Sequence, residues 1–188
     1  MKKALSKRTD KDLHRAVMVH AQLVRKDQLQ RMAAIGMIPS IFCGSYVLLG
    51  RYPSSNFGEK RGSQISPVKD AIDYGMKYTF HQDTPVIPPD MMRTISSAVN
   101  RISRGGRVIG ENQKISVLDA LKAVTIYAAY QYFEEHEKGS IECGKYADFV
   151  VLEKNPLKTP KEELAEIKVW MTIKENEVIY RSGEANHE

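Results

Sequence analysis

Short apolar segments alternate with amphipathic segments between residues 16 and 103, and this alternation constrains the fold more than any other feature of the chain. The apolar segments are 16–24 (AVMVHAQLV), 37–44 (MIPSIFCG) and 76–80 (MKYTF), and each is typical of a buried β-strand. A helical pattern follows each of them. The order strand, helix, strand, helix, strand, helix predicts right-handed crossovers on a parallel sheet, so we expect an α/β fold.

Helix start and stop signals support this order. Residues 66–75 (SPVKDAIDYG) begin with Ser66 as the expected N-cap and stop at a glycine. Asp90 marks the start of the helical segment that follows the third strand. Further along, residues 116–133 carry apolar side chains near one face and begin with a serine cap, so they predict one packing helix.

The pattern changes after residue 139. Residues 139–157 (GSIECGKYADFVVLEKNPL) combine a glycine-rich turn with an apolar strand. Residues 168–180 (KVWMTIKENEVIY) contain two strand-like runs around a polar turn at 174–177, which predicts a hairpin. We therefore expect two units, an α/β part at 1–135 and a small β segment at 136–188.

Ionisable side chains stand at the ends of two predicted strands. His20 comes late in the first strand, and His81 and Asp83 directly follow the third. Sites in parallel α/β folds lie at the carboxyl ends of the strands, so these three residues are candidates for one site. Two structural alternatives stay open: Asp83 before Thr-Pro also fits an Asx turn, and each histidine also fits a core imidazole bonded to a carbonyl.

Composition excludes several classes of protein. With 42% hydrophobic residues the chain can form a core, but no stretch approaches the roughly 20 apolar residues of a membrane span. The N-terminus has no apolar signal region. Cys43 and Cys143 are far apart and form no metal-binding pattern, so we expect reduced thiols in a cytoplasmic protein.

The net charge of +5 could suggest nucleic-acid binding. However, apart from the N-terminal tail and RISRGGR at 101–107, the basic residues of the first part are scattered, and they are not interleaved with aromatic residues. A solvated surface is the better interpretation, and we expect no nucleic-acid partner.

Several segments together resemble the C-terminal part of the amidohydrolase superfamily, in its amidohydrolase 3 branch. They include VHAQ at 19–22, FHQDTPV at 80–86 and GSIECGKYADFVVL at 139–152, where Cys143 stands at a position usually occupied by proline. The resemblance implies a (β/α)8 TIM barrel plus a composite β-sandwich. Residues 1–135 would supply about strands 6 to 8 of that barrel with their helices, and 136–188 a sandwich segment.

The resemblance also implies roles for single residues. His20 matches a metal ligand after the sixth strand, and Asp83 matches the aspartate after the eighth strand that binds metal and accepts a proton from the attacking water. The resemblance gives His81 no ligand role, so we expect it to contact the substrate or support a ligand. The family's other ligands, an HxH pair, a bridging acidic or carboxylated lysine residue and one more histidine, would precede Met1.

Hydrolysis of an amide-like bond needs a metal-bound water, a carboxylate that accepts its proton and a cation that polarises the carbonyl. Catalytic zinc usually has three protein ligands, and this chain offers His20 and Asp83 with His81 as a candidate third. Our leading hypothesis is the C-terminal portion of a metal-dependent amidohydrolase that hydrolyses a small amide, carbamate or cyclic amide and is inactive as the isolated chain. The alternative is a non-catalytic remnant or assembly module that self-associates.

Three barrel strands leave two unpaired edges, which favour association. We therefore expect the chain to be a piece of a longer protein, to form a homo-oligomer, or to pair with a separately encoded N-terminal half.

Overall fold

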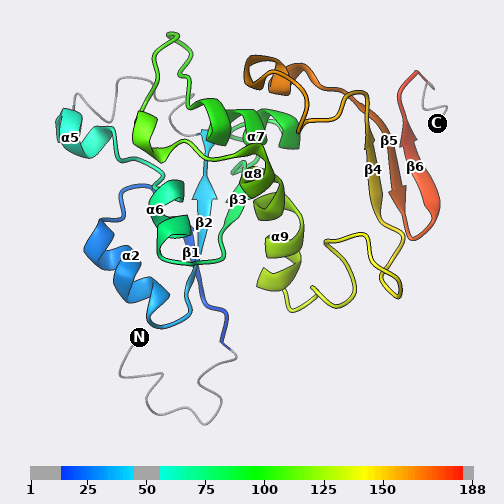
Figure 1. Ribbon diagram of the computed structural model, residues 1–188, viewed down its shortest axis with the longest axis horizontal. Coiled ribbons are helices and arrows are strands. Elements are labelled where there is room, and N and C mark those ends of the chain that lie inside the picture. Colours follow the sequence, from blue (N-terminus) through cyan, green and yellow to red (C-terminus); the bar gives the residue numbers. More distant parts are fainter. Residues whose placement is uncertain (1–13, 45–55, 184–188) are drawn as a thin grey trace.

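The computed structural model describes residues 14–44 and 56–183 (Figure 1). Its first sheet contains β1 (Val17–His20), β2 (Ile38–Phe42) and β3 (Thr79–His81), in that order and all parallel. The expected parallel sheet is therefore present. In the described ranges β1 and β3 are its outer strands, and Val19 of β1 is 59% exposed.

Helices connect and follow the strands of this sheet. In Figure 1, α2 and α6 lie beside β1 and β2, whereas α8 and α9 lie beside β3. No helix in the described part of the chain combines the length and apolar character needed to cross a membrane. The bounds are α2 (Lys26–Ala33), α5 (Glu59–Gly62), α6 (Val68–Asp73), α7 (Met91–Asn100), η1 (Glu111–Gln113), α8 (Val117–Val124) and α9 (Ile126–Gln131).

The core lies between this sheet and its helices. Tyr78 and Phe80 are alternate residues, so they face the same side, and Ile41 is the partner of Phe80 on the neighbouring strand. All three are buried in one cluster with Leu29 of α2 and Val68 of α6. These buried side chains of the first sheet therefore pack against its helices.

The first strand is shorter than the predicted segment 16–24. It stops at His20 because the backbone of His20 and Ala21 enters the left-handed region, with φ values of 66° and 45°. The third strand is displaced relative to 76–80 and includes His81 as its last residue.

The prediction that Ser66 caps a helix is wrong. Pro67 is the N-cap of α6 and provides no side-chain hydrogen bond, while Ser66 has a φ of 53°. The Ser66 hydroxyl instead donates to the carbonyl oxygen of Phe42, at 3.3 Å. A contact with the end of β2 has therefore replaced the local cap.

The expected single helix at 116–133 is divided into α8 and α9. Thr125 has φ −125° and ψ −99°, which lie outside the helical region. Its hydroxyl donates to the carbonyl of Leu121, a contact that often bends helices. The expected caps are confirmed, because Ser116 accepts from the amide of Asp119 and Asp90 accepts from that of Arg93.

The second sheet is antiparallel and has the order β4 (Phe149–Leu152), β5 (Val169–Lys174) and β6 (Glu177–Arg181). The hairpin predicted around 174–177 is confirmed. This sheet lies beyond α9 in Figure 1. The connection η2 (Lys161–Glu166) packs against α7, where the Asn100 amide donates to the carbonyl of Lys161 at 2.6 Å.

Candidate metal centre

The three parallel strands end at one edge of the first sheet. His20, Phe42 and His81 are the last residues of β1, β2 and β3. The register pairs Phe42 directly with His81 and places His20 beside Ile41. Polar side chains from segments about 60 residues apart therefore reach the same place because the strands run parallel.

His20, His81 and Asp83 form a compact cluster. One ligand atom from each residue lies within 4.8 Å of the other two, and the two imidazole centroids are 5.0 Å apart. Ligands about 2.1 Å from a zinc ion are separated by about 3.4 Å in a tetrahedron, so shifts on the order of 1 Å would let all three bind one ion. The three side chains that follow or end the strands therefore lie together, and a shared functional site stays a prediction.

The backbone of the cluster is unusual. His20 and Asp83 have φ values of 66° and 56°, in the left-handed region that non-glycine residues rarely adopt. Such conformations persist where surrounding contacts enforce them, and they are concentrated at functional sites.

The structural alternatives do not describe Asp83 or the Nε2 atom of His81. Within the described ranges the Asp83 carboxylate accepts no hydrogen bond from the backbone that follows it, so it forms no Asx turn. The Nε2 atom of His81 is buried and has no hydrogen-bond partner, so this nitrogen is not bonded to a core carbonyl.

The surroundings of His81 favour its neutral form. Burial lowers the pKa of its imidazole below the ordinary 6.5, nearby His20 lowers that pKa further, and Asp83 opposes both effects. A neutral imidazole has a lone pair available for a metal. Two imidazoles and one carboxylate suit zinc and related divalent ions, and the unpaired Nε2 is an atom that such an ion would satisfy.

Two further residues support the cluster, and the sequence analysis missed both. The ring of Phe42 stacks on His81, with centroids 5.5 Å apart at 23°, and meets the ring of His20 edge-on at 6.3 Å. Gln82 is buried and donates to the hydroxyl of Thr94 at 3.1 Å, which attaches the turn after β3 to α7. Phe42 ends β2 and Gln82 follows β3, and these positions at strand ends could have identified both residues from the sequence.

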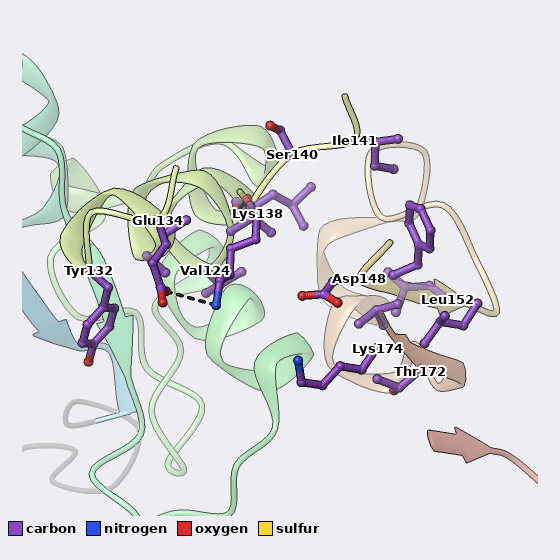
Figure 2. A pocket seen from close by; sticks show the side chains of 18 of the residues that line it. Val124, Tyr132, Glu134, Lys138, Ser140, Ile141, Asp148, Leu152, Thr172 and Lys174 are labelled. Atoms are coloured by element: carbon purple, nitrogen blue, oxygen red, sulfur yellow. Dashed lines mark hydrogen bonds and ion pairs between the residues drawn. The ribbon is translucent and has the colours of Figure 1, made fainter. Parts of the chain in front are cut away.

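A cavity of about 640 Å³ lies away from the cluster, and none of the three cluster residues lines it. It lies between α8–α9 and the second sheet (Figure 2). Its lining is mainly apolar, with the ion pair between Lys138 and Glu134 (3.1 Å) on one wall and Asp148 and Lys174 on the other. The charged side chains that line this cavity therefore lie on two walls, one formed by the segment after α9 and the other by the second sheet.

Known sequences relate most of this chain to one family. The sequence model of the amidohydrolase family matches residues 2–180. An N-substituted formamide deformylase from Arthrobacter pascens is 27% identical over 169 residues, which are 87% of this chain and 31% of that protein.

Solved structures share the fold. A metal-dependent hydrolase of unknown role from Pyrococcus horikoshii OT3 superposes with a TM-score of 0.69 at 26% identity, over 79% of this chain and 30% of that one. An adenosine deaminase from Xanthomonas campestris with bound zinc has a TM-score of 0.64 at 16% identity, over 92% of this chain and 38% of that one. The chain thus spans about a third of the length of the proteins it matches.

Proposed function

This chain belongs to the amidohydrolase family, and on that premise we propose that it forms the C-terminal part of a metal-dependent hydrolase. The reaction is cleavage of a carbon–nitrogen bond other than a peptide bond in a small molecule. One observation carries this proposal: ligand atoms of His20, His81 and Asp83 lie within 4.8 Å of one another at the carboxyl edge of a parallel sheet.

In this proposal β1, β2 and β3 are strands 6 to 8 of a (β/α)8 barrel. Their parallel order and the exposed edge at Val19 support this assignment. Residues 1–135 then belong to the barrel and 136–188 to a β-sandwich. The other barrel strands would come from chain beyond these 188 residues or from a partner chain.

His20, His81 and Asp83 would hold the divalent ion, with zinc as the first candidate. When bound, such an ion acidifies a water molecule and polarises the carbonyl group of the substrate. The two imidazoles would bind the ion through the lone pairs of neutral ring nitrogens, and burial favours the neutral form at His81. The exposed carboxylate of Asp83 remains accessible to water and substrate.

Asp83 is also the proposed general base. One carboxylate oxygen takes a proton from the attacking water as the new carbon–oxygen bond forms. The same proton then passes to the nitrogen atom as the carbon–nitrogen bond breaks, so the leaving group departs as a neutral amine. Asp83 thereby returns to its charged form at the end of each cycle.

Metal binding by the 188-residue chain tests the proposal directly. We expect calorimetry to detect about one Zn²⁺ or Co²⁺ per chain, and His20→Ala, His81→Ala and Asp83→Asn each to weaken binding at least about tenfold. His136→Ala is the matched control, because its side chain is 88% exposed and outside the cluster. Absent binding, or equal binding in all four variants, would contradict the proposal.

Activity is a separate readout. We expect the isolated chain to bind metal without turnover, since it spans only about a third of its relatives. An N-substituted formamide is a suitable first substrate for the complete protein, and Asp83→Asn should abolish its hydrolysis while leaving the protein folded.

A further inference from the structure

Arg101 is a fully buried cation outside the metal-binding cluster. It is the C-cap of α7 and adopts a left-handed backbone with a φ of 56°. Its guanidinium donates to three backbone carbonyls, through Nε to Ile109 at 2.6 Å, Nη1 to Ser66 at 3.1 Å and Nη2 to Ile65 at 2.6 Å. One side chain therefore connects the end of α7, the segment at residue 109 and the segment before α6.

Ser66 carries this connection to the strand ends. It is fully buried, and its backbone N–H donates to the carbonyl of Gln22 at 2.7 Å. Its hydroxyl donates to the carbonyl of Phe42 at 3.3 Å. Gln22 lies two residues after His20, and the ring of Phe42 stacks on His81. Ser66 thus bonds to the backbone two residues after His20 and to that of Phe42, whose ring contacts both imidazoles.

The geometry favours arginine at this position. Ile65 and Ser66 present adjacent carbonyl oxygens, and the planar guanidinium can donate to both at once while Nε reaches Ile109. A lysine ammonium would offer one mobile point charge in place of this fixed arrangement. Removing the cation would leave buried carbonyls without these donors.

We propose that Arg101 is a positioning residue for the metal centre. It fixes the backbone of Ile65 and Ser66, and Ser66 in turn fixes the turn after β1 and the end of β2. His20 is thereby held in its left-handed conformation, and Phe42 is held against His81. This inference rests on the proposed metal-binding function, but it concerns a residue that touches neither metal nor substrate.

The test compares Zn²⁺ affinity and amide hydrogen exchange in the 188-residue wild type and in Arg101→Lys. We expect the substitution to weaken Zn²⁺ binding about tenfold or more, as supporting residues behind metal ligands typically do. The Ser66 amide should exchange faster, because the strand-end contact loosens. Tyr78→Phe is the matched control, since it removes another buried hydroxyl-to-carbonyl bond, to Asp119 at 3.1 Å, without touching Ser66.

Ser66→Ala provides a second variant in case Arg101→Lys does not fold. It removes the hydroxyl that donates to the Phe42 carbonyl and keeps the backbone bonds to Gln22 and Arg101, so the fold should persist and Zn²⁺ affinity should fall by about threefold. If both variants fold, their effects on affinity should be less than additive, because they act along one route.

The outcomes separate the two proposals. A wild type that binds no Zn²⁺ contradicts the proposed function, and the positioning role falls with it. A wild type that binds Zn²⁺, with unchanged affinity in Arg101→Lys and Ser66→Ala, overturns only the positioning role. Equal losses in Arg101→Lys and Tyr78→Phe also overturn it, because the effect would then reflect general destabilisation.

Discussion

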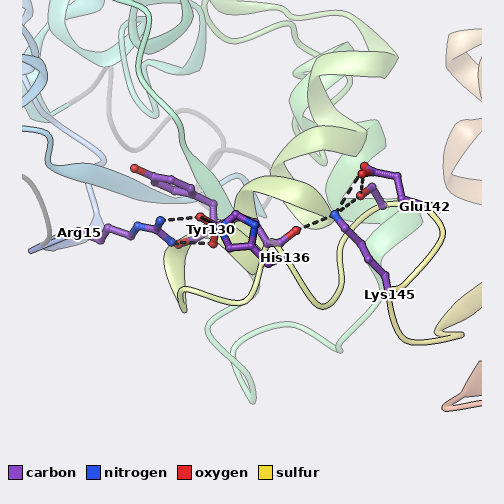
Figure 3. A network of polar contacts seen from close by, with 7 residues as sticks. Arg15, Tyr130, His136, Glu142 and Lys145 are labelled. Atoms are coloured by element: carbon purple, nitrogen blue, oxygen red, sulfur yellow. Dashed lines mark hydrogen bonds and ion pairs between the residues drawn. The ribbon is translucent and has the colours of Figure 1, made fainter.

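Arg15 and Glu135 form a two-point ion pair across 120 residues of sequence, with nitrogen–oxygen distances of 2.7 and 2.5 Å (Figure 3). The same guanidinium lies 3.6 Å from the ring centroid of Tyr130 and donates to the Tyr130 carbonyl. Lys145 donates to the carbonyl of Glu135 at 2.6 Å. The segment that enters β1 is therefore attached to the end of α9, and Glu135 links both to the glycine-rich turn that carries Lys145.

Replacing Arg15 by alanine should lower the free energy of unfolding by about 2–4 kcal/mol. The variant loses charged hydrogen bonds, worth about 1.5–3 kcal/mol, and a cation–π contact worth about 0.5–1 kcal/mol. Urea denaturation measures the change. Arg93→Ala is the control, because its side chain is 70% exposed and its pair with Asp90 should contribute less than about 1 kcal/mol. Similar losses in both variants would contradict a special role for Arg15.

The same pair predicts a dependence of stability on pH. Hydrogen bonds from Arg15 are the main reason that the pKa of Glu135 falls from the ordinary 4.5 to about 2. Since the carboxylate is more acidic in the folded chain, its stabilising contribution is fully present above pH 4.5 and is lost as the pH falls toward 2. The free energy of unfolding should therefore fall more steeply in the wild type than in Glu135→Gln over this range. Parallel pH curves from urea denaturation would exclude this assignment.

Gly110 should not tolerate a side chain. A Cβ atom at this position would lie 2.0 Å from the Ser63 carbonyl oxygen and 3.2 Å from Nη2 of Arg101, and φ is 68°. Gly110→Ala should cost more than about 3 kcal/mol, through steric displacement added to backbone strain. Gly106→Ala isolates the strain, because φ is 74° there and nothing lies within 4 Å, so it should cost about 1 kcal/mol. Thermal and urea unfolding should rank the two variants in this order, and equal costs would contradict the steric explanation.

Local pattern predicted the elements around the site well. Apolar runs identified the segments that contain β1, β2 and most of β3, and the caps at Asp90 and Ser116 formed as expected. The candidates His20, His81 and Asp83 were identified from their position at strand ends, and they meet in space. Their roles in binding metal remain predictions.

Local pattern failed where distant contacts competed with it. Serine is a common helix N-cap, but the Ser66 hydroxyl donates to a carbonyl of β2, 24 residues away in the sequence. The segment at 116–133 has one apolar face, but the backbone breaks at Thr125. Arg101 begins a basic run, RISRGGR at 101–107, and that run gave no sign that this side chain would be fully buried.

The spacing of apolar residues along the chain determines which face of each helix or strand is buried. The repeated order of strand and helix predicts parallel strands, whose carboxyl ends lie at one edge of the sheet. Those properties are local and can be read from neighbouring residues. The 4.8 Å cluster, the stacked ring of Phe42 and the bonds from Arg101 to Ile65 and Ser66 require a particular path of the whole chain. They became visible only in three dimensions, because each joins groups whose separation depends on how the intervening elements pack.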